Sequence, residues 1–255
     1  MELCITYLGG PTALVEFGGL RLVTDPTFDP AGTEYPAAAY TLRKTQSPAV
    51  AAADLGAVDA VLLSHDHHAD NLDMAGRRFL ASVPVIYTTV TGAERLGGTA
   101  RGLTPWQSIA CPTASGGTVQ LTAVPARHGP AGGDRGPVLG FVLEADGAAV
   151  YFSGDTVWFE GVEEIGRRFR IDAALLNLGA AQVTVAGPHA LTFTAAEAVE
   201  LARRWPHASI VPLHFEGWEH FTEGRGEIES AFRAAGLDAR VRWLAPGAVT
   251  HFGKP

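Results

Sequence analysis

Three of the nine histidines in this 255-residue chain stand together at His65, His67 and His68, with Asp70 two residues further on. They directly follow a mostly apolar run at residues 58–63, which has the length and composition of a buried strand. Neutral imidazoles and carboxylates are good ligands for zinc and related divalent ions. A strand that ends in several such donors predicts a metal site, whereas a solvated polar loop seldom gathers three histidines.

Further donors of the same kind follow other apolar runs. They are His128, Asp155 and His214, which follow the runs 118–124, 148–152 and 208–213. Histidines that only pack a core would not be expected at the ends of several strands. Because a sheet delivers its strand ends to one rim, we expect these side chains to meet there and form a functional site.

Taken in this order, the motifs resemble the metallo-β-lactamase superfamily, and within it the lactonase-like and phosphodiesterase-like hydrolases. The resemblance begins with residues 7–16 and 22–26, continues through the histidine cluster, and reaches residues 211–215. It covers most of the chain. It implies an α/β fold of the four-layer αβ/βα sandwich type, formed as a single domain over residues 1–255, with a metal site at one edge of the two sheets.

The resemblance also implies a first metal site, but the cluster departs from the family pattern His-x-His-x-Asp-His by one additional residue. His65 matches the first ligand. His67 and His68 compete for the second position, because the pattern can be anchored from either end of the cluster. His128 matches the third ligand, so this first site is expected to be intact.

For a second site, Asp155 matches the bridging carboxylate of the family, and Asp70 and His214 match two further ligands. Asn71 stands where the family has its last histidine. Because an amide is a weak ligand, this substitution is expected to loosen the second site. The predicted cofactor is one tightly held divalent ion and one weaker one, zinc first and manganese or iron as alternatives.

Such a site predicts hydrolysis without a covalent intermediate. A divalent ion lowers the pKa of bound water from near 16 towards about 7 and polarises a substrate oxygen, so that metal-bound hydroxide attacks. Asp155 would hold the hydroxide, and Asp70 would orient it or accept its proton. The chain has no Gly-x-Ser-x-Gly motif, and Cys4 and Cys111 lie outside the motif segments. The preferred substrate is a lactone or another ester, followed by a phosphodiester.

Two other functions stay open at this point. The same fold also hosts single-iron oxygenases that act on persulfides, and an intact first site would allow that chemistry. A protein that binds or senses a metal without turnover is the third possibility. A purely structural three-histidine site would not need Asp70 and Asp155, which argues against this third function.

Several residues near these motifs have a functional and a structural interpretation. Asp25 resembles an aspartate that supports the metal site in the superfamily, and it also stands in an Asp-Pro turn. His189 resembles a histidine on an active-site loop of the lactonase-like group, where it would protonate the leaving group or bind substrate; otherwise it is a loop histidine. Glu216 and His220 face the cleft or belong to a solvated turn.

Two irregular segments, 26–48 and 129–137, are candidate walls of the cleft or ordinary surface connections. The cationic side chains on or beside them are Arg43, Lys44, Arg127 and Arg135. In an acidic chain, cations beside metal ligands lead us to expect that at least one of them contacts an anionic group of a small-molecule substrate.

The composition agrees with a compact enzyme. The chain is 47% hydrophobic and carries a formal charge of −8, which argues against general affinity for nucleic acids or anionic membranes. It has no apolar stretch of membrane-spanning length and no signal-like amino terminus, so a cytoplasmic location with reduced cysteines is expected. The sequence leaves the oligomeric state open.

The elements that position the donors follow from the apolar pattern. Short strands are expected at residues 3–8, 13–17 and 20–24, with Gly18 and Gly19 as a tight turn before the third. Strand-rich and helix-rich segments alternate after these strands, which favours a layered α/β class.

Helices are expected in the carboxy-terminal half. Thr194 and Glu197 form a capping-box pattern that predicts a helix over 195–205. A second helix is expected over 227–235, because Gly236 follows it at a position favoured just beyond a helix end.

Overall fold

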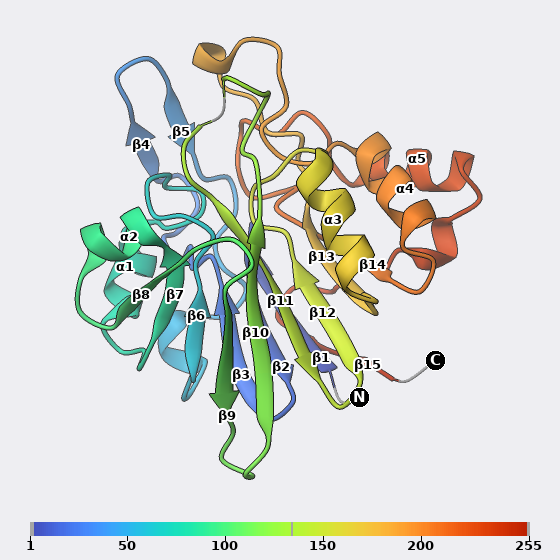
Figure 1. Cartoon of the computed structure of the whole chain (residues 1–255). Helices are drawn as coiled ribbons and strands as arrows, with labels where there is room; N and C mark the ends of the chain where they lie inside the picture. Colours follow the sequence, from blue (N-terminus) through green and yellow to red (C-terminus); the bar gives the residue numbers. More distant parts are fainter. Residues whose placement is uncertain (1–2, 134, 254–255) are drawn as a thin grey trace.

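Two mixed β-sheets pack face to face in the computed structural model, which describes residues 3–133 and 135–253 (Figure 1). The first sheet contains β1 (Leu3–Gly9), β2 (Thr12–Phe17), β3 (Leu20–Thr24), β6 (Ala60–Leu62), β7 (Ile86–Thr89), β8 (Ala100–Leu103) and β15 (Val249–Phe252). The second contains β9 (Ser108–Pro112), β10 (Thr118–Pro125), β11 (Leu139–Ala145), β12 (Ala148–Phe152), β13 (Ala173–Asn177) and β14 (Ser209–Leu213). A separate hairpin pairs β4 (Glu34–Pro36) with β5 (Thr41–Arg43).

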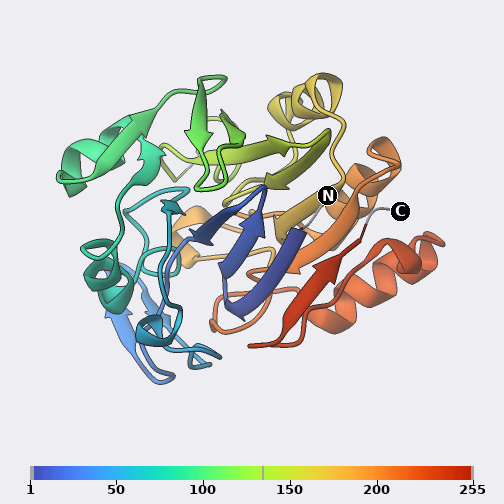
Figure 2. The same ribbon diagram turned by 90° about the horizontal axis from the view of Figure 1, so that it is seen from below.

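The two sheets follow the same plan. The strand order is β15-β1-β2-β3-β6-β7-β8 in the first sheet and β14-β13-β12-β11-β10-β9 in the second. In each sheet, neighbours related by hairpins pair antiparallel, and the strands beyond β3 and β12 pair parallel. Viewed from below (Figure 2), β15 lies beside β1, with which it pairs although the two are far apart in the sequence.

Helices cover the outer face of each sheet and complete the four layers (Figure 1). They are α1 (Met74–Leu80) and α2 (Val90–Leu96) beside the first sheet, and α3 (Glu160–Arg168), α4 (Ala195–Arg204) and α5 (Arg225–Ala234) beside the second. Single turns of 3₁₀-helix lie at Ala52–Asp54, Thr184–Ala186 and Asp238–Arg240. Among the described residues, no helix combines the length and apolar character needed to cross a membrane.

Alternation along the strands builds the core. In β12, Val150 and Phe152 join the cluster between the sheets, whereas Tyr151 joins the cluster under the helices. Successive side chains of a strand point to opposite faces, so a strand buried on both faces is apolar throughout. This explains why the runs that precede the donor residues are almost continuously apolar.

The predicted elements are confirmed with small shifts at their ends. The amino-terminal strands agree to within one residue, and α4 begins at Ala195 as expected. The capping box is present, because Thr194 accepts a hydrogen bond from the Glu197 N–H and Glu197 accepts one from the Thr194 N–H. The second helix begins two residues earlier than expected, at Arg225, where the Glu227 carboxylate accepts the N–H of Gly224.

Gly76 in α1 offers a test of how tightly the outer layer is packed. A Cβ atom at this position would lie 1.8 Å from the carbonyl oxygen of Pro26, whereas one at Gly226 in α5 would meet no atom within 4 Å. We expect Gly76→Ala to lower the free energy of unfolding by about 1–3 kcal/mol through overpacking. Gly226→Ala should be neutral or slightly stabilising, because alanine favours helix. Denaturant unfolding of both variants checks this, and equal stabilities would contradict it.

Candidate metal centre

Three imidazoles converge at the edge where β6 and β10 end. Nε2 of His65 lies 2.9 Å from Nδ1 of His68, and Nε2 of His128 lies 3.1 Å from the same atom. The three ligand atoms all lie within 4.8 Å of one another. Two nitrogens on a tetrahedral zinc ion, at about 2.0–2.1 Å from it, would be about 3.3 Å apart. The spacing therefore fits a shared divalent ion.

The hydrogen bonds behind these imidazoles define which ring nitrogens face the cluster. Nδ1 of His128 lies 2.8 Å from the carbonyl oxygen of Leu191, which can only accept, so this nitrogen carries the proton. Nδ1 of His65 lies 2.9 Å from Oγ of Ser64, whose hydroxyl donates to Asp25. Nε2 of both histidines consequently presents a lone pair to the cluster, as a metal ligand must.

The same environment keeps His65 and His68 neutral. Burial, reinforced by the neighbouring imidazoles, holds the pKa of His65 well below its usual range and lowers the pKa of His68 to about 3. Protons therefore compete weakly with a cation for these nitrogens near neutral pH. Nε2 of His65 and Nε2 of His128 both face Nδ1 of His68, and a single proton on that atom cannot serve both of them.

The structure places His68, and not His67, in the cluster. The ring of His67 donates through Nε2 to the carbonyl of Arg135, 2.9 Å away, and its side chain is 25% exposed. Asp66, on the other side of the turn, is paired with Arg95. The positions of the ring nitrogens therefore favour His68 over His67 as the second ligand.

Asp155 lies beside the three histidines and is fully buried. Its Oδ1 atom accepts hydrogen bonds from Asn177 at 2.7 Å and from Nδ1 of His214 at 3.1 Å. Its Oδ2 atom has no hydrogen-bond partner and lies 3.7 Å from Nε2 of His128. Burial opposes its ionisation, but the neighbouring imidazoles, His214 first, hold the pKa of Asp155 well below its usual range. The free carboxylate oxygen faces the cluster.

Asp70 is the second carboxylate of the centre. Its Oδ2 atom lies 3.0 Å from Nε2 of His220 and 3.7 Å from Nε2 of His214. Burial alone would raise the pKa of Asp70, but the hydrogen bond from His220 and the nearby imidazoles lower it more. The donors expected for a second metal are therefore gathered, with His220 added to them.

Asp25 and Asn71 support the centre from behind. Asp25 accepts hydrogen bonds from the backbone N–H of Ser64 at 2.6 Å, from its hydroxyl at 2.7 Å, and from the Asn71 amide at 2.9 Å. Burial raises the pKa of Asp25 to about 7 despite these hydrogen bonds. The supporting interpretation of Asp25 thus agrees with its contacts, and Asn71 belongs to the support.

Backbone strain accompanies the site. His214 has φ of 52°, in the left-handed region that non-glycine residues seldom adopt. Its N–H donates to the carbonyl of Gly10 at 2.8 Å, and its ring is held by Asp155. Such strain persists only where the surrounding contacts impose it, and it concentrates at functional sites.

A small inner pocket opens on these groups. Its volume is about 20 Å³, and the described residues that line it are Tyr40, Leu42, His68, Asp70, His128, Arg135, Ala181, Val183, Leu191 and His220. A guanidinium nitrogen of Arg135 lies 3.4 Å from the hydroxyl of Tyr40. Glu216 and the exposed His189 are outside this lining, so the catalytic role of His189 stays a prediction.

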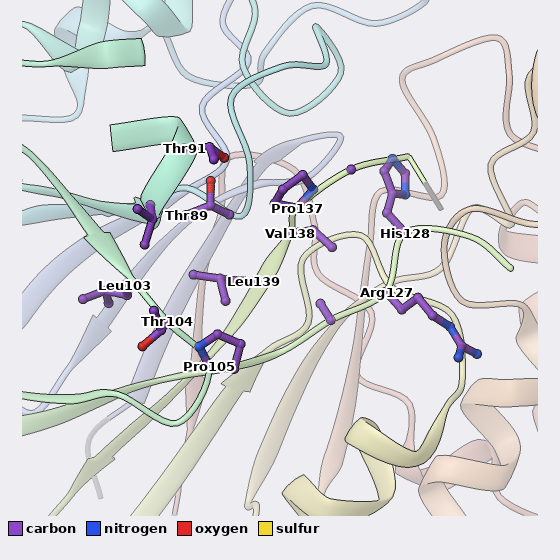
Figure 3. Close-up of a pocket in the computed structure, with 13 residues that line it drawn as sticks. Thr89, Thr91, Leu103, Thr104, Pro105, Arg127, His128, Pro137, Val138 and Leu139 are labelled. Carbon is purple, nitrogen blue, oxygen red and sulfur yellow. The ribbon is translucent and has the colours of Figure 1, made fainter. Parts of the chain in front are cut away.

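A larger cavity of about 460 Å³ lies on another side of His128 (Figure 3). Side chains after β7 and β8, among them Thr91 and Pro105, form one wall, and Pro137 and Val138 belong to the other. This volume is typical of sites for small organic molecules.

The four cations named from the sequence differ in their surroundings. Arg43 is exposed and pairs with Glu34 and Glu219. The Lys44 ammonium is buried, 3.0 Å from Asp73.

The guanidinium of Arg127 lies over the ring of Phe159, with 4.8 Å to the centroid, and points away from the His128 ring (Figure 3). Only Arg135, of the four, lines the inner pocket. It is the one positioned to meet a substrate bound there.

Sequence reasoning missed Asn177 as a contributor to the site. This residue, which orients Asp155, ends β13 next to the other donor strands, so its position at a strand end was an available signal. Tyr40 lies in the segment 26–48, which the sequence offered as a candidate wall, and it lines the inner pocket. Its partner Arg135 is far away in the sequence. No local pattern reveals that contact.

Comparisons with known proteins agree with this geometry. A family model described as "Beta-lactamase superfamily domain" matches residues 20–215. A UPF0173 metal-dependent hydrolase of Pelotomaculum thermopropionicum is 32% identical over 253 residues, which covers 95% of this chain and 97% of that protein. One from Archaeoglobus fulgidus is 28% identical over 272 residues, which covers 98% and 99%.

Solved structures share the fold at lower sequence identity. The isothiocyanate hydrolase from Delia radicum gut bacteria superposes with a TM-score of 0.83 at 23% identity, covering 98% of this chain and 100% of that one. Igni18, a metallo hydrolase from Ignicoccus hospitalis, superposes with a TM-score of 0.70 at 20% identity, and each chain is fully covered.

The assignment of the cluster can be tested with two neighbouring histidines. We expect His68→Ala to abolish the tight binding of a divalent ion, because it removes one of three converging nitrogens. His67→Ala should retain the ion. Elemental analysis after dialysis against metal-free buffer measures the difference, and equal metal content in the two variants would contradict the assignment.

Lys44 and Arg43 allow a matched test of a buried and an exposed ion pair. Lys44→Ala leaves the Asp73 carboxylate buried without its cation, which should cost about 3–5 kcal/mol of unfolding free energy. Arg43→Ala removes only exposed pairs and should barely shift the unfolding midpoint. Denaturant titration of both variants measures this. A Lys44→Ala variant as stable as the wild type would show that Asp73 is solvated or paired elsewhere.

Proposed function

We propose that this chain, which belongs to the β-lactamase superfamily and is a metal-dependent hydrolase, hydrolyses carboxylic esters, with lactones as the preferred substrates. The observation that carries the proposal is the unpartnered Oδ2 atom of Asp155, which lies beside three converging imidazoles and near a pocket large enough for one water molecule. This arrangement fits the activation of water against a polarised acyl carbon.

The chemistry divides between the ion and the protein. A divalent ion held by His65, His68 and His128 would lower the pKa of a bound water towards about 7 and polarise the substrate oxygen. Asp155 is placed to hold this water and accept its proton, because its Oδ2 atom is the free acceptor that faces the cluster. Asp70 lines the inner pocket and would orient the water there.

The inner pocket favours water over a covalent nucleophile. The described residues that line it include no serine, threonine or cysteine. The hydroxyl of Tyr40 is engaged by Arg135. Direct attack by water is therefore the route that these residues support.

The lining also favours an ester over a phosphodiester. Leu42, Val183 and Leu191 form apolar walls, and Arg135 is the only cationic side chain among the described lining residues. The carboxylate of Asp70 lines the same pocket and would repel a second anionic group next to the scissile bond. With the pocket opened by a side-chain movement, these walls would favour a neutral acyl group, and a remote carboxylate could reach Arg135.

Two observations would redirect the proposal. An iron-loaded protein that consumes oxygen would indicate the persulfide oxygenase considered from the sequence. A protein that binds its metal and turns over no member of a broad ester panel would indicate a sensing role. The panel should include lactones, phosphodiesters and, because of the similar fold, an isothiocyanate.

Asp155→Asn tests the role of the free carboxylate oxygen. The amide is a poor base for the water, so turnover of the best lactone should fall by about 100-fold or more while the circular dichroism spectrum is retained. Asp54→Asn, at an exposed position, serves as the matched control and should keep full activity. An Asp155→Asn variant with near wild-type turnover would sink the proposed water activation.

Arg135 and Arg127 form a matched pair for substrate recognition. Arg135→Ala should raise KM for an ester that carries a remote carboxylate by about tenfold and leave the neutral analogue nearly unchanged, since one charge-assisted contact is lost. Arg127→Ala, whose guanidinium points away from the centre, should treat the two substrates alike. Steady-state kinetics on the two esters measure this. Equal effects of Arg135→Ala on both would leave a neutral lactone as the substrate class.

A further inference from the structure

Asp70 lies between two imidazoles that come from different parts of one carboxy-terminal segment. Its Oδ2 atom is 3.0 Å from Nε2 of His220 and 3.7 Å from Nε2 of His214. The His214 side chain is fully buried, and those of Asp70 and His220 are 8% and 10% exposed. A carboxylate and two imidazoles therefore converge beside the three-histidine cluster.

The second ring nitrogen of His214 faces Asp70 without a hydrogen bond. Nδ1 of His214 lies 3.1 Å from an oxygen of Asp155, which accepts its proton. Nε2 of the same ring is buried and has no hydrogen-bond partner, and it faces the Oδ2 atom of Asp70, 3.7 Å away. Burial disfavours a charge on His214, but the carboxylates of Asp155 and Asp70 raise its pKa. These carboxylates thus favour positive charge at this position, which a divalent ion can also supply.

Asn71 does not complete this group as a histidine would. Its amide nitrogen donates to Asp25, 2.9 Å away, so the side chain is engaged in supporting the turn. His220 approaches Asp70 from the opposite end of the sequence instead. The imidazole missing near position 71 is thus supplied from a loop.

The loop that carries His220 is held by contacts on both sides of it. The His220 carbonyl accepts the N–H of Gln182 at 3.0 Å, and the N–H of Glu219 donates to the carbonyl of Arg43 at 3.1 Å. The ring of His220 also packs against that of Phe221, with 4.7 Å between centroids. A ligand held in this way is pre-organised for binding.

We propose that His220 is a ligand of a second divalent ion, together with His214 and Asp70 and next to the free oxygen of Asp155. Two imidazoles and a carboxylate form a donor set suited to zinc, cobalt or manganese. The proposal concerns metal binding and goes beyond ester hydrolysis. It holds whichever substrate class the enzyme prefers.

Cobalt titration of the full-length protein tests the proposal without any substrate. The protein is stripped with a chelator, Co²⁺ is added stepwise, and bound metal is followed by elemental analysis and visible absorption. The wild type should bind two equivalents. His220→Ala should keep the first and weaken the second by at least about tenfold. His189→Ala, at an exposed loop histidine, should bind as the wild type does.

Two further variants separate ligation from a hydrogen-bonding role. His220→Gln keeps a donor that can reach Asp70 but replaces imidazole by a weak amide ligand, so the second equivalent should again be weakened. His220→Cys should add a sulfur-to-cobalt charge-transfer band that the wild type lacks, because thiolate binds such ions well. A wild type that binds one equivalent at saturating Co²⁺, a His220→Gln variant with unchanged second-site affinity, or a Cys variant that binds two ions without that band would each overturn the proposal.

Discussion

The carboxylate of Asp25 accepts three hydrogen bonds from Ser64 and Asn71, and the metal centre depends on this contact. It joins the turn after β3 to the turn after β6, and it orients the Ser64 hydroxyl so that this group can receive the Nδ1 proton of His65. The lone pair of His65 is thereby aimed at the cluster. Asp25 acts on His65 only through the Ser64 hydroxyl, yet it determines which ring nitrogen of His65 carries the proton. Its own burial is tolerable because every oxygen has a donor.

How much could be predicted from the sequence depended on whether a contact was local. The strand ends that carry His65 and the other donors were predictable, because apolar runs show where both faces of a strand are buried. The choice between His67 and His68 was not, since it depends on how a turn with one additional residue closes. His220 follows no strand, and its loop is positioned by partners far away in the chain. Lys44 is chemically similar to its exposed neighbour, and only the tertiary structure buries it against a carboxylate.

The centre concentrates polar atoms without hydrogen-bond partners. Oδ2 of Asp155 and Nε2 of His214 are both buried in this state. Each such atom costs free energy on folding, which the apolar layers on either side must offset. A cation that satisfies them would bind the folded chain and not the unfolded one, so the stability of the fold and the occupancy of the centre are linked. The left-handed backbone of His214 adds to the same cost.

The contact between Tyr40 and Arg135 borders a pocket of about 20 Å³ in front of Asp70. A molecule larger than water would have to displace lining side chains such as these two, and rotation of such side chains is fast compared with typical turnover. The closed arrangement then acts as a sieve for shape. Slender acyl groups would pass with a small displacement, whereas groups branched next to the carbonyl would need a larger one. Steric selection would in this way precede any electronic preference of the centre.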